Sequence, residues 1–165
     1  MPVRPILVYP HPLLKAISRA CSGVDEEIRG AAQDLLETMR AHPGCIGLAA
    51  PQIGIPRRII AVDVTGHPKA TVAHGPLVII DPRILASDGS KIGREGCLSL
   101  PSITADVARA VRIYVKGLTI LGEEVSAETR GFEARVIQHE IDHLDGILIL
   151  DRVASPAEIF PRRRS

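Results

Sequence analysis

The chain has 165 residues, of which 45% are hydrophobic, and its 20 Lys and Arg against 19 Asp and Glu give a formal net charge of +1. Charges this evenly balanced exclude a protein that holds nucleic acid mainly by neutralising phosphates, and an aromatic content of 2% argues against stacking platforms for single-stranded bases. The length predicts a single domain over residues 1–165, with enough apolar residues for a core without disulfides or a structural metal.

Features tied to membranes and secretion are missing from the sequence. No apolar run is long enough for a membrane span, and the first ten residues (MPVRPILVYP) lack the apolar stretch of a secretory signal. The cysteines Cys21, Cys45 and Cys97 are odd in number and far apart. We therefore expect a cytoplasmic protein with reduced thiols, and neither a membrane nor DNA as a partner.

The first predicted helix covers about residues 25–40. Its apolar residues recur every three or four positions, which is typical of a helix lying on a core. The acidic residues at 25–27 suit the positive end of the helix dipole, and Pro43-Gly44 ends the pattern.

Strands follow, and then a second helix. The runs at 59–62, 77–80 and 111–115 are short, β-branched and bounded by Gly, Pro or charged turns, which predicts strands. The second helix is predicted over about residues 128–145, with Gly146 placed to stop it. A helix, several strands and a helix form an α+β order, which differs from the alternation of a parallel α/β sheet.

The second predicted helix carries His139, Glu140 and His143 in the spacing His-Glu-x-x-His. Residues four apart on a helix lie about 40° apart around its axis and about 6 Å apart along it, so both imidazoles can bind one metal ion. Glu140 lies about 100° from His139, where it can reach a water on the metal. The pattern predicts a hydrolytic metal site, and the alternative is a surface helix that carries these residues without such a role.

A catalytic metal usually takes three protein ligands and a water. One known extension of the motif needs His at position 149, where this chain has Ile149, and the only downstream glutamate is Glu158 near the end of the chain. The third ligand is therefore expected upstream. Cys97 is the best-placed thiol, because Gly96 permits close approach and Pro101 cannot continue a strand ladder, so Cys97 should lie where a strand opens into a loop. A small buried hydrophobic residue is an equally good interpretation of Cys97.

Three segments together resemble the motifs of the peptide deformylases: residues 47–52 (GLAAPQ), 95–99 (EGCLS) and 138–144 (QHEIDHL). The resemblance extends weakly from Tyr9-Pro10 to Asp151-Arg152. It implies an α+β fold with mixed or antiparallel sheets packed around a central metal-binding helix. It also implies a metal-dependent hydrolase of protein biosynthesis, which removes the N-formyl group from the N-terminal methionine of newly synthesised polypeptides and releases formate.

The resemblance assigns the chemistry to particular residues. Cys97, His139 and His143 would hold the metal, and Glu140 would be the general base and acid for attack by a metal-bound water. The residues support this chemistry independently, because a metal lowers the pKa of bound water and a nearby carboxylate can move its proton. A thiolate and two imidazoles are typical of zinc. The family resemblance instead implies Fe²⁺, one per chain, with Zn²⁺ as a substitute, and we follow the resemblance.

Further roles follow from the same resemblance. The side chain of Gln52 and the backbone N–H of Leu98 would form the oxyanion hole, although Gln52 alone is also typical of a turn residue after Pro51. The backbone around Gly47 would pair with the substrate, an N-formylmethionyl peptide. Four residues are expected to line the substrate site: Gly47, Ile46, Glu95 and Val136. For Ile46 and Val136, packing in the core is an equally good explanation.

The chain departs from the family pattern at two places. The first motif usually has Gly two residues before Gly47, where this chain has Cys45, whose side chain could crowd the substrate or place an oxidisable thiol near the metal. Many members carry a Glu and an Arg after Pro101, where this chain has Ser102, Ile103 and Thr104, so its preference beyond methionine is left open.

Residues outside the motifs receive plainer interpretations. Asp142 is expected to face solvent or cap a neighbour, with support of a metal ligand as the alternative. Residues 162–164 (RRR) are expected to form a solvated tail, with transient contact to ribosomal RNA as the alternative. Four histidines are assigned to turns or solvated loops: His11, His42, His67 and His74.

Two rival functions use the same ligands. A protease or another deacylase could share the metal site, and a metal-binding module could hold the ion without catalysis. Glu140 and Gln52 have no necessary role in a protein that only binds a metal, so their presence favours an enzyme.

Overall fold

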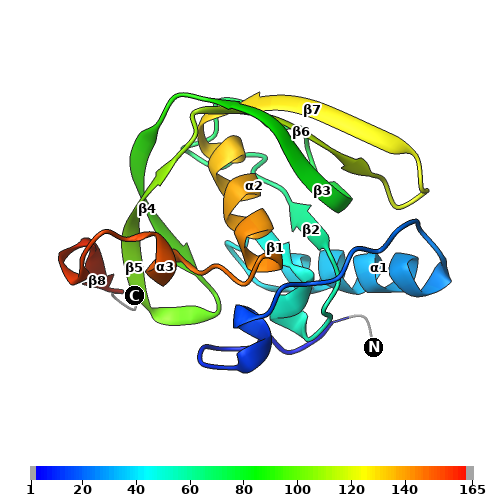
Figure 1. Cartoon of the computed structure of the whole chain (residues 1–165), viewed down its shortest axis with the longest axis horizontal. Helices are drawn as coiled ribbons and strands as arrows, with labels where there is room; N and C mark the ends of the chain where they lie inside the picture. The colour runs from blue at the N-terminus through cyan, green and yellow to red at the C-terminus, as the bar shows by residue number, and fades with distance from the viewer. Residues whose placement is uncertain (1–2, 163–165) are drawn as a thin grey trace.

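The computed structural model describes residues 3–162 and contains two antiparallel sheets with a long helix between them (Figure 1). The helices are α1 (Glu26–Ala41), α2 (Gly131–Leu144) and α3 (Ile149–Arg152), and short 3₁₀ turns cover Pro12–Lys15, Ala50–Ile53 and Pro156–Glu158. The strands are β1 (Gly47–Ala49), β2 (Ile59–Val62), β3 (Leu77–Asp88), β4 (Lys91–Cys97), β5 (Leu100–Arg109), β6 (Arg112–Leu118), β7 (Glu124–Arg130) and β8 (Ile159–Pro161).

The sheet order leaves two strands with a free edge near the centre of the molecule. One sheet runs β1-β2-β3-β6-β7 and the other β4-β5-β8, and all of these pairings are antiparallel. β1 and β4 are therefore each paired on one side only within the described residues. The predicted α+β class is confirmed, and the sheets contain no parallel strand pair in residues 3–162.

Helix α1 matches the sequence prediction closely. Asp25 caps its N-terminus by accepting the N–H of Ile28 at 2.9 Å, which satisfies one of the donors that a helix start leaves unpaired. The apolar stripe is buried against β1 and β2, with Leu35 and Ala32 fully buried. This helix covers one face of the five-stranded sheet and supports the first motif from behind.

The predicted start of the second helix was wrong. Residues 124–130 pair with β6 as strand β7, and α2 begins only at Gly131. The sequence before Gly131 contains helix-forming residues, but cross-strand pairing overrides this local preference. Gly131 has a φ of +64°, which lets the chain turn sharply from strand to helix.

The C-terminal end of α2 is as expected. Its predicted apolar face is buried, including Ile137 and Leu144. Gly146 follows the helix with a φ of +70°, and a Cβ there would lie 2.5 Å from the carbonyl oxygen of Lys15. Glycine is therefore needed both for the backbone conformation and for the close approach of the preceding segment.

The predicted strands are present, and two of them are longer than expected. The strand predicted at 77–80 continues to Asp88, and β6 extends to Leu118. Pro101 was expected to interrupt a ladder, yet it lies within β5. The register between β4 and β5 shifts next to Pro101: Gly96 pairs with Thr104, but the following residue, Cys97, pairs with Leu100. The shift removes Pro101 from regular pairing with β4, which a residue without an N–H requires.

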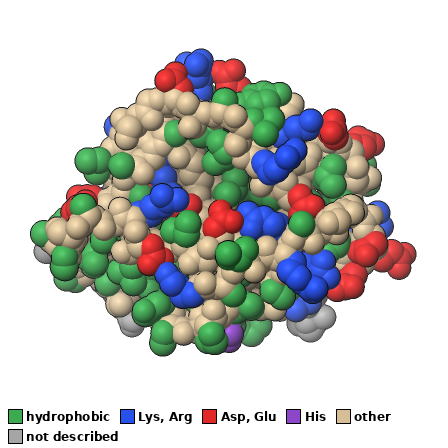
Figure 2. All heavy atoms as spheres, viewed as in Figure 1, with side chains coloured by type: hydrophobic (Ala, Val, Ile, Leu, Met, Phe, Trp, Pro, Cys, Tyr) green, Lys and Arg blue, Asp and Glu red, His purple; other side chains and the backbone are tan. Residues whose placement is uncertain are grey.

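Helix α2 lies in the centre of the molecule, next to β1 and β2, and it also contacts β6 and β7 (Figure 1). One buried cluster joins α2 to the five-stranded sheet, and another joins the three-stranded sheet to α3. On the face seen in Figure 2, acidic and basic side chains are interspersed. Among residues 3–162, no helix combines the length and apolar character that crossing a lipid bilayer requires.

Candidate metal centre

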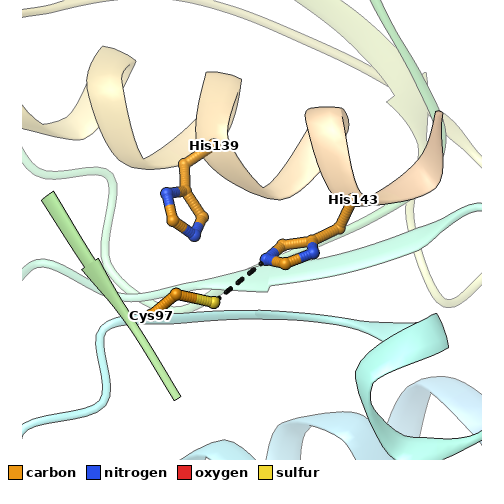
Figure 3. A group of neighbouring side chains, drawn as sticks. All are labelled: Cys97, His139 and His143. Carbon is orange, nitrogen blue, oxygen red and sulfur yellow. Dashed lines mark hydrogen bonds between the residues drawn. The ribbon is translucent and has the colours of Figure 1, made fainter. Parts of the chain in front are cut away.

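Three predicted ligands converge between α2 and the end of β4. The ligand atoms of Cys97, His139 and His143 all lie within 4.8 Å of one another, and Figure 3 shows both rings turned towards the cysteine sulfur. The His143 Nε2 is 3.4 Å from the Cys97 Sγ. Cys97 is the last residue of β4, so the prediction that it lies where a strand opens into a loop is confirmed. One helical turn and one strand end thus bring together a thiol and two imidazoles.

A carboxylate on β4 orients the first histidine. The Glu95 Oε1 accepts a hydrogen bond from the His139 Nδ1 at 2.9 Å, which turns the His139 Nε2 towards the cluster. The other contacts of Glu95 come from two guanidinium groups, since Arg109 donates to both of its oxygens at 2.9 and 3.0 Å and Arg135 donates to Oε2 at 2.7 Å. Glu95 was predicted to line the substrate site, and both of its oxygens are occupied by protein donors.

The charge network continues to the far side of α2 through Asp142. Arg109, with 6% of its surface exposed, donates to Asp142 at 2.5 Å, and Arg152 donates to both oxygens of Asp142 at 2.6 and 2.9 Å. The expectation that Asp142 faces solvent was wrong, because α2 turns this residue towards β5 and α3. Together with Arg152, whose side chain is 44% exposed, the largely buried Arg109 and Arg135 give every oxygen of Glu95 and Asp142 a partner, as buried charges require.

Glu140 differs from every other buried carboxylate of the centre. It is 4% exposed, and its Oε1 has no hydrogen-bond partner within the described residues. Burial raises the pKa of Glu140 to about 7, partly offset by His139, while Glu95 adds to the rise. The side chain lines the same cavity as Cys97 and His139. A carboxylate without a partner beside a candidate metal site is poised to exchange protons.

Gln52 is anchored at both ends of its amide. Its Oε1 accepts the N–H of Ala49 at 2.9 Å, and its Nε2 donates to the Ser99 Oγ at 3.1 Å and lies 3.6 Å from the Cys97 Sγ. Ser99 in turn donates to the carbonyl of Leu7 at 2.7 Å. This fixed orientation points N–H groups of the amide at the cluster. The adjacent Leu98, predicted to contribute its backbone N–H, lies in the turn after β4 and lines the cavity.

Gly47 brings backbone directly against the face of α2 that carries Glu140 and Val136. A Cβ at this position would lie 2.7 Å from the Glu140 Oε2 and 2.7 Å from the Val136 Cγ1. The Ile46 carbonyl accepts the N–H of Asp63 on the β2 side. Because backbone groups alternate along a strand, the N–H and C=O of Gly47 face the free edge of β1. Ile46, Gly47 and Val136, three of the predicted substrate residues, therefore share one cavity wall.

The cavity has a volume of about 460 Å³ and lies between the free edges of β1 and β4. All four residues predicted to bind substrate line it, together with Gln52, Leu98, Glu140 and two of the three predicted metal ligands. Its apolar wall also contains Phe132, which the sequence analysis missed. Phe132 stacks on His67 with ring centroids 4.4 Å apart, so this histidine is part of the cavity wall and not only of a solvated loop.

Cys45 lines the cavity beside Gly47. Its Sγ donates to the carbonyl oxygen of Gly47 at 3.3 Å, the carbonyl that faces the free edge. Burial, aided by the nearby Glu140 carboxylate, raises the pKa of the Cys45 thiol to about 12. The thiol is therefore protonated at neutral pH, which favours crowding of the substrate over oxidation as its effect.

The surroundings of the cluster favour a cation. Burial disfavours charge on His139, but Glu140, Cys97 and Glu95 together raise its pKa well above the ordinary range. Burial and the neighbouring His139 lower the pKa of His143 well below that range, so the second ring stays neutral. Burial opposes ionisation of Glu95, yet the donors His139 and Arg109 hold its pKa far below the usual value. A thiol, two imidazoles and a negative environment fit a divalent transition metal.

Comparison with known proteins agrees with this geometry. The family model "Polypeptide deformylase" matches residues 3–158. A peptide deformylase of Phenylobacterium zucineum is 44% identical over 157 residues, covering 93% of this chain and 89% of the relative. A crystal structure of the Ehrlichia chaffeensis peptide deformylase in complex with actinonin has a TM-score of 0.87 at 35% identity, covering 96% of this chain and 92% of that one. A Met-Ala-Ser-bound class I type b peptide deformylase of Acinetobacter baumannii has a TM-score of 0.81 at 35% identity, with 92% and 98% covered. The fold, the metal-ligand cluster and these relatives together place the chain in the peptide deformylase family, to which it belongs.

Proposed function

We propose that this metal-dependent deformylase uses Glu140 to move the proton when it removes the N-formyl group from the N-terminal methionine of newly synthesised polypeptides. The observation that carries the proposal is the buried Glu140 carboxylate, whose Oε1 lacks a partner within the described residues, lining one cavity with Cys97 and His139. The other carboxylates near α2 are held by arginines or other donors. Glu140 is thus the carboxylate left available for a reacting molecule.

Cys97, His139 and His143 would hold the metal. When bound, the metal lowers the pKa of a water molecule and polarises the formyl carbonyl. Ferrous iron is the ion we propose, following the resemblance to the family, with zinc as a substitute. Glu95 would act by keeping the His139 Nε2 directed at the metal, and not by touching the peptide, because protein donors occupy both of its oxygens.

Glu140 would take a proton from the attacking water and pass it to the leaving nitrogen. The water oxygen bonds to the formyl carbon, the C–N bond breaks, and the nitrogen receives the proton, so the products are formate and a peptide with a free amino group. General acid–base catalysis of this kind contributes about 10²–10⁴-fold to a rate. The pKa of about 7 suits a group that must accept and donate in turn.

The oxyanion would be stabilised by the Gln52 Nε2 and the backbone N–H of Leu98. Gln52 supports this role because Ala49 fixes its carbonyl end and Ser99 fixes its orientation. A donor that is already oriented needs no rearrangement as negative charge develops on the formyl oxygen.

The peptide would lie as an added strand in the gap between β1 and β4. The N–H and C=O of Gly47 face that gap, and a strand added to a sheet edge gains main-chain hydrogen bonds. The methionine side chain would pack on Ile46, Val136 and Phe132, the apolar residues of the cavity wall. The predicted contact with ribosomal RNA stays a prediction, and Arg163 and Arg164 lie outside the described residues.

The test is release of formate from formyl-Met-Ala-Ser by protein purified without oxygen and loaded with ferrous iron, with zinc-loaded protein alongside. We expect rapid release, faster with iron, and near-complete loss in Glu140→Ala with the metal still bound. Acetyl-Met-Ala-Ser is the control for a general deacylase, and release of free methionine would indicate a peptidase. A fully metallated wild type that releases no formate would refute the proposal.

A further inference from the structure

The cavity that holds the catalytic groups is also lined by four basic side chains: Lys69, Arg94, Arg135 and Arg162. Two of the four are neutralised by carboxylates, since Arg135 pairs with Glu95 at 2.7 Å and Arg94 with Asp106 at 2.8 Å. For Lys69 and Arg162, residues 3–162 supply no ion pair. Both are exposed, so they lie where the cavity meets solvent. Two cations without a counter-charge therefore flank the path of the substrate.

Arg162 is held in place by the C-terminal strand. β8 pairs with β5 at Ile103, and the N–H of Arg162 donates to the carbonyl of Ser102 at 2.9 Å. Ser102 and Ile103 belong to the segment after Pro101, where the sequence departs from the family pattern and leaves the peptide preference beyond methionine open. Arg162 was expected to lie in a solvated tail, but its backbone is bound to β5. Its guanidinium Nη1 lies 3.2 Å from the position of a Cβ at Gly96, so the absence of a side chain there lets Arg162 lie across β4.

Lys69 lines the cavity near Phe132, on a loop with its own anchors. His67 and His74 belong to this loop, which joins β2 to β3. The N–H of His74 donates to the Glu133 Oε2 at 2.7 Å, His67 stacks on Phe132, and the Lys69 Nζ lies 5.9 Å from the centroid of the same ring. Glu133 is fully buried at the start of α2. The loop therefore presents Lys69 from a fixed position.

We propose that Lys69 and Arg162 select peptides with an acidic side chain in the second or third residue after the formyl-methionine. The inference rests on the proposed function and adds a substrate class to it. Gly96 is next to the metal-ligand Cys97 on β4, and an extended peptide advances about 3.3 Å per residue. Arg162 lies over Gly96, so the side chain of the second or third residue after the formyl-methionine is placed within its reach. In a chain still being synthesised, aspartate and glutamate supply the carboxylates.

The test compares kcat/KM for formyl-Met-Ala-Glu-amide, formyl-Met-Ala-Gln-amide and formyl-Met-Ala-Lys-amide, whose amidated ends remove the terminal carboxylate. We expect wild-type protein to prefer the glutamate peptide over the glutamine peptide by roughly threefold to tenfold, and the preference to shrink at high salt. Arg162→Gln and Lys69→Gln should each reduce this ratio, their combination should bring it close to one, and Arg162→Lys should keep most of it.

Arg83→Gln is the matched control, because it removes one exposed positive charge on β3 outside this cavity and should leave the ratio unchanged. An equal rate for all three peptides would overturn the inference and leave the proposed function standing, whereas no hydrolysis of the glutamine peptide would refute the proposed function itself. A ratio that survives in the double variant, combined with weakened ribosome binding, would reassign Arg162 to contact with RNA.

Discussion

The buried carboxylates on the two sides of helix α2 differ in whether their oxygens have hydrogen-bond partners. Behind the candidate metal ligands, Glu95 and Asp142 have every oxygen bonded to a histidine or to an arginine. On the cavity side, the Glu140 Oε1 has no partner within residues 3–162. We call the first set the rear network (Glu95, Arg109, Arg135, Asp142 and Arg152) and the second the front face (Cys45, Gly47, Gln52 and Glu140).

The difference suggests that the rear network orients the candidate metal ligands, whereas the front face provides the groups that we propose react. A saturated buried network is rigid, because losing one partner leaves an uncompensated charge. An unsaturated carboxylate is costly to bury, and a protein retains it where a reacting molecule will supply the missing partner. Changes in the rear network should therefore affect metal binding and stability, whereas changes in the front face should affect kcat or KM.

After the near-complete loss expected for Glu140→Ala, the largest effect is expected from Gln52→Leu on the front face. Removing the Nε2 donor should lower kcat by about 10²–10³-fold, because one oriented donor to a developing oxyanion is worth that much. Metal content should remain at the wild-type level, since the rear network is untouched. Steady-state kinetics and metal analysis on the same preparation check both points.

Gln138→Leu is the matched control for that substitution. Gln138 also holds backbone groups, accepting the N–H of Ala110 and donating to its carbonyl, both at 3.0 Å. Its loss should cost stability to a similar degree with a much smaller change in kcat. Equal losses of kcat in the two variants would show that Gln52 acts only through folding.

Glu95→Gln tests the rear network. The variant removes the negative charge between His139, Arg109 and Arg135, and we expect a 10–100-fold loss of metal affinity, the range typical when the partner of a ligating histidine is removed. Unfolding free energy should fall by about 3 kcal/mol, because two buried guanidinium groups lose a counter-charge. Metal titration and denaturant unfolding measure these effects. Asp106→Asn, at the exposed partner of Arg94, is the control, and a Glu95 variant with unchanged metal affinity would break the comparison.

Cys45→Gly should sharpen the definition of the front face by a smaller amount. Without the thiol, the Gly47 carbonyl is free for a substrate N–H, so KM should fall by roughly twofold to fivefold while kcat stays the same. Cys45→Ala separates this effect from added backbone flexibility. Unchanged KM and oxygen sensitivity in both variants would show that Cys45 has no influence on activity.

The smallest effect is expected outside both regions, at Asp151. Partial burial opposes ionisation, but Lys15 and the N–H of Leu148 lower the pKa of Asp151 below its ordinary 3.8. Stability from the ionised form is therefore fully present above that value and is lost as pH falls through the lower folded-state value. Asp151→Asn keeps the acceptor for Leu148 and should cost less than about 1 kcal/mol at neutral pH, since the pair is exposed. The difference from wild type, measured by denaturant unfolding, should vanish in acid. A difference independent of pH would exclude the ion pair as its cause.

How much could be predicted from sequence follows from how local each feature is. The helix beginning after Asp25, the helical spacing of His139 and His143 and the strand end at Cys97 depend on neighbouring residues, and these predictions agree with the structure. The rear network could not be predicted in this way, because Glu95, Arg109 and Asp142 come from three elements that only the tertiary fold brings together. The strand at 124–130 was missed because most of its side chains are exposed or half-buried, so the apolar alternation of a strand is weak.

The two free strand edges beside the cavity also bear on how the protein avoids self-association. An unpaired edge invites strands from other molecules, and proteins counter this with short or charged edge strands. β1 has only three residues, and β4 carries the exposed cations Lys91 and Arg94. The opening in which we propose that the peptide binds is thus poorly suited to seed a growing sheet, and the same pair of edges would serve substrate entry and resist self-association.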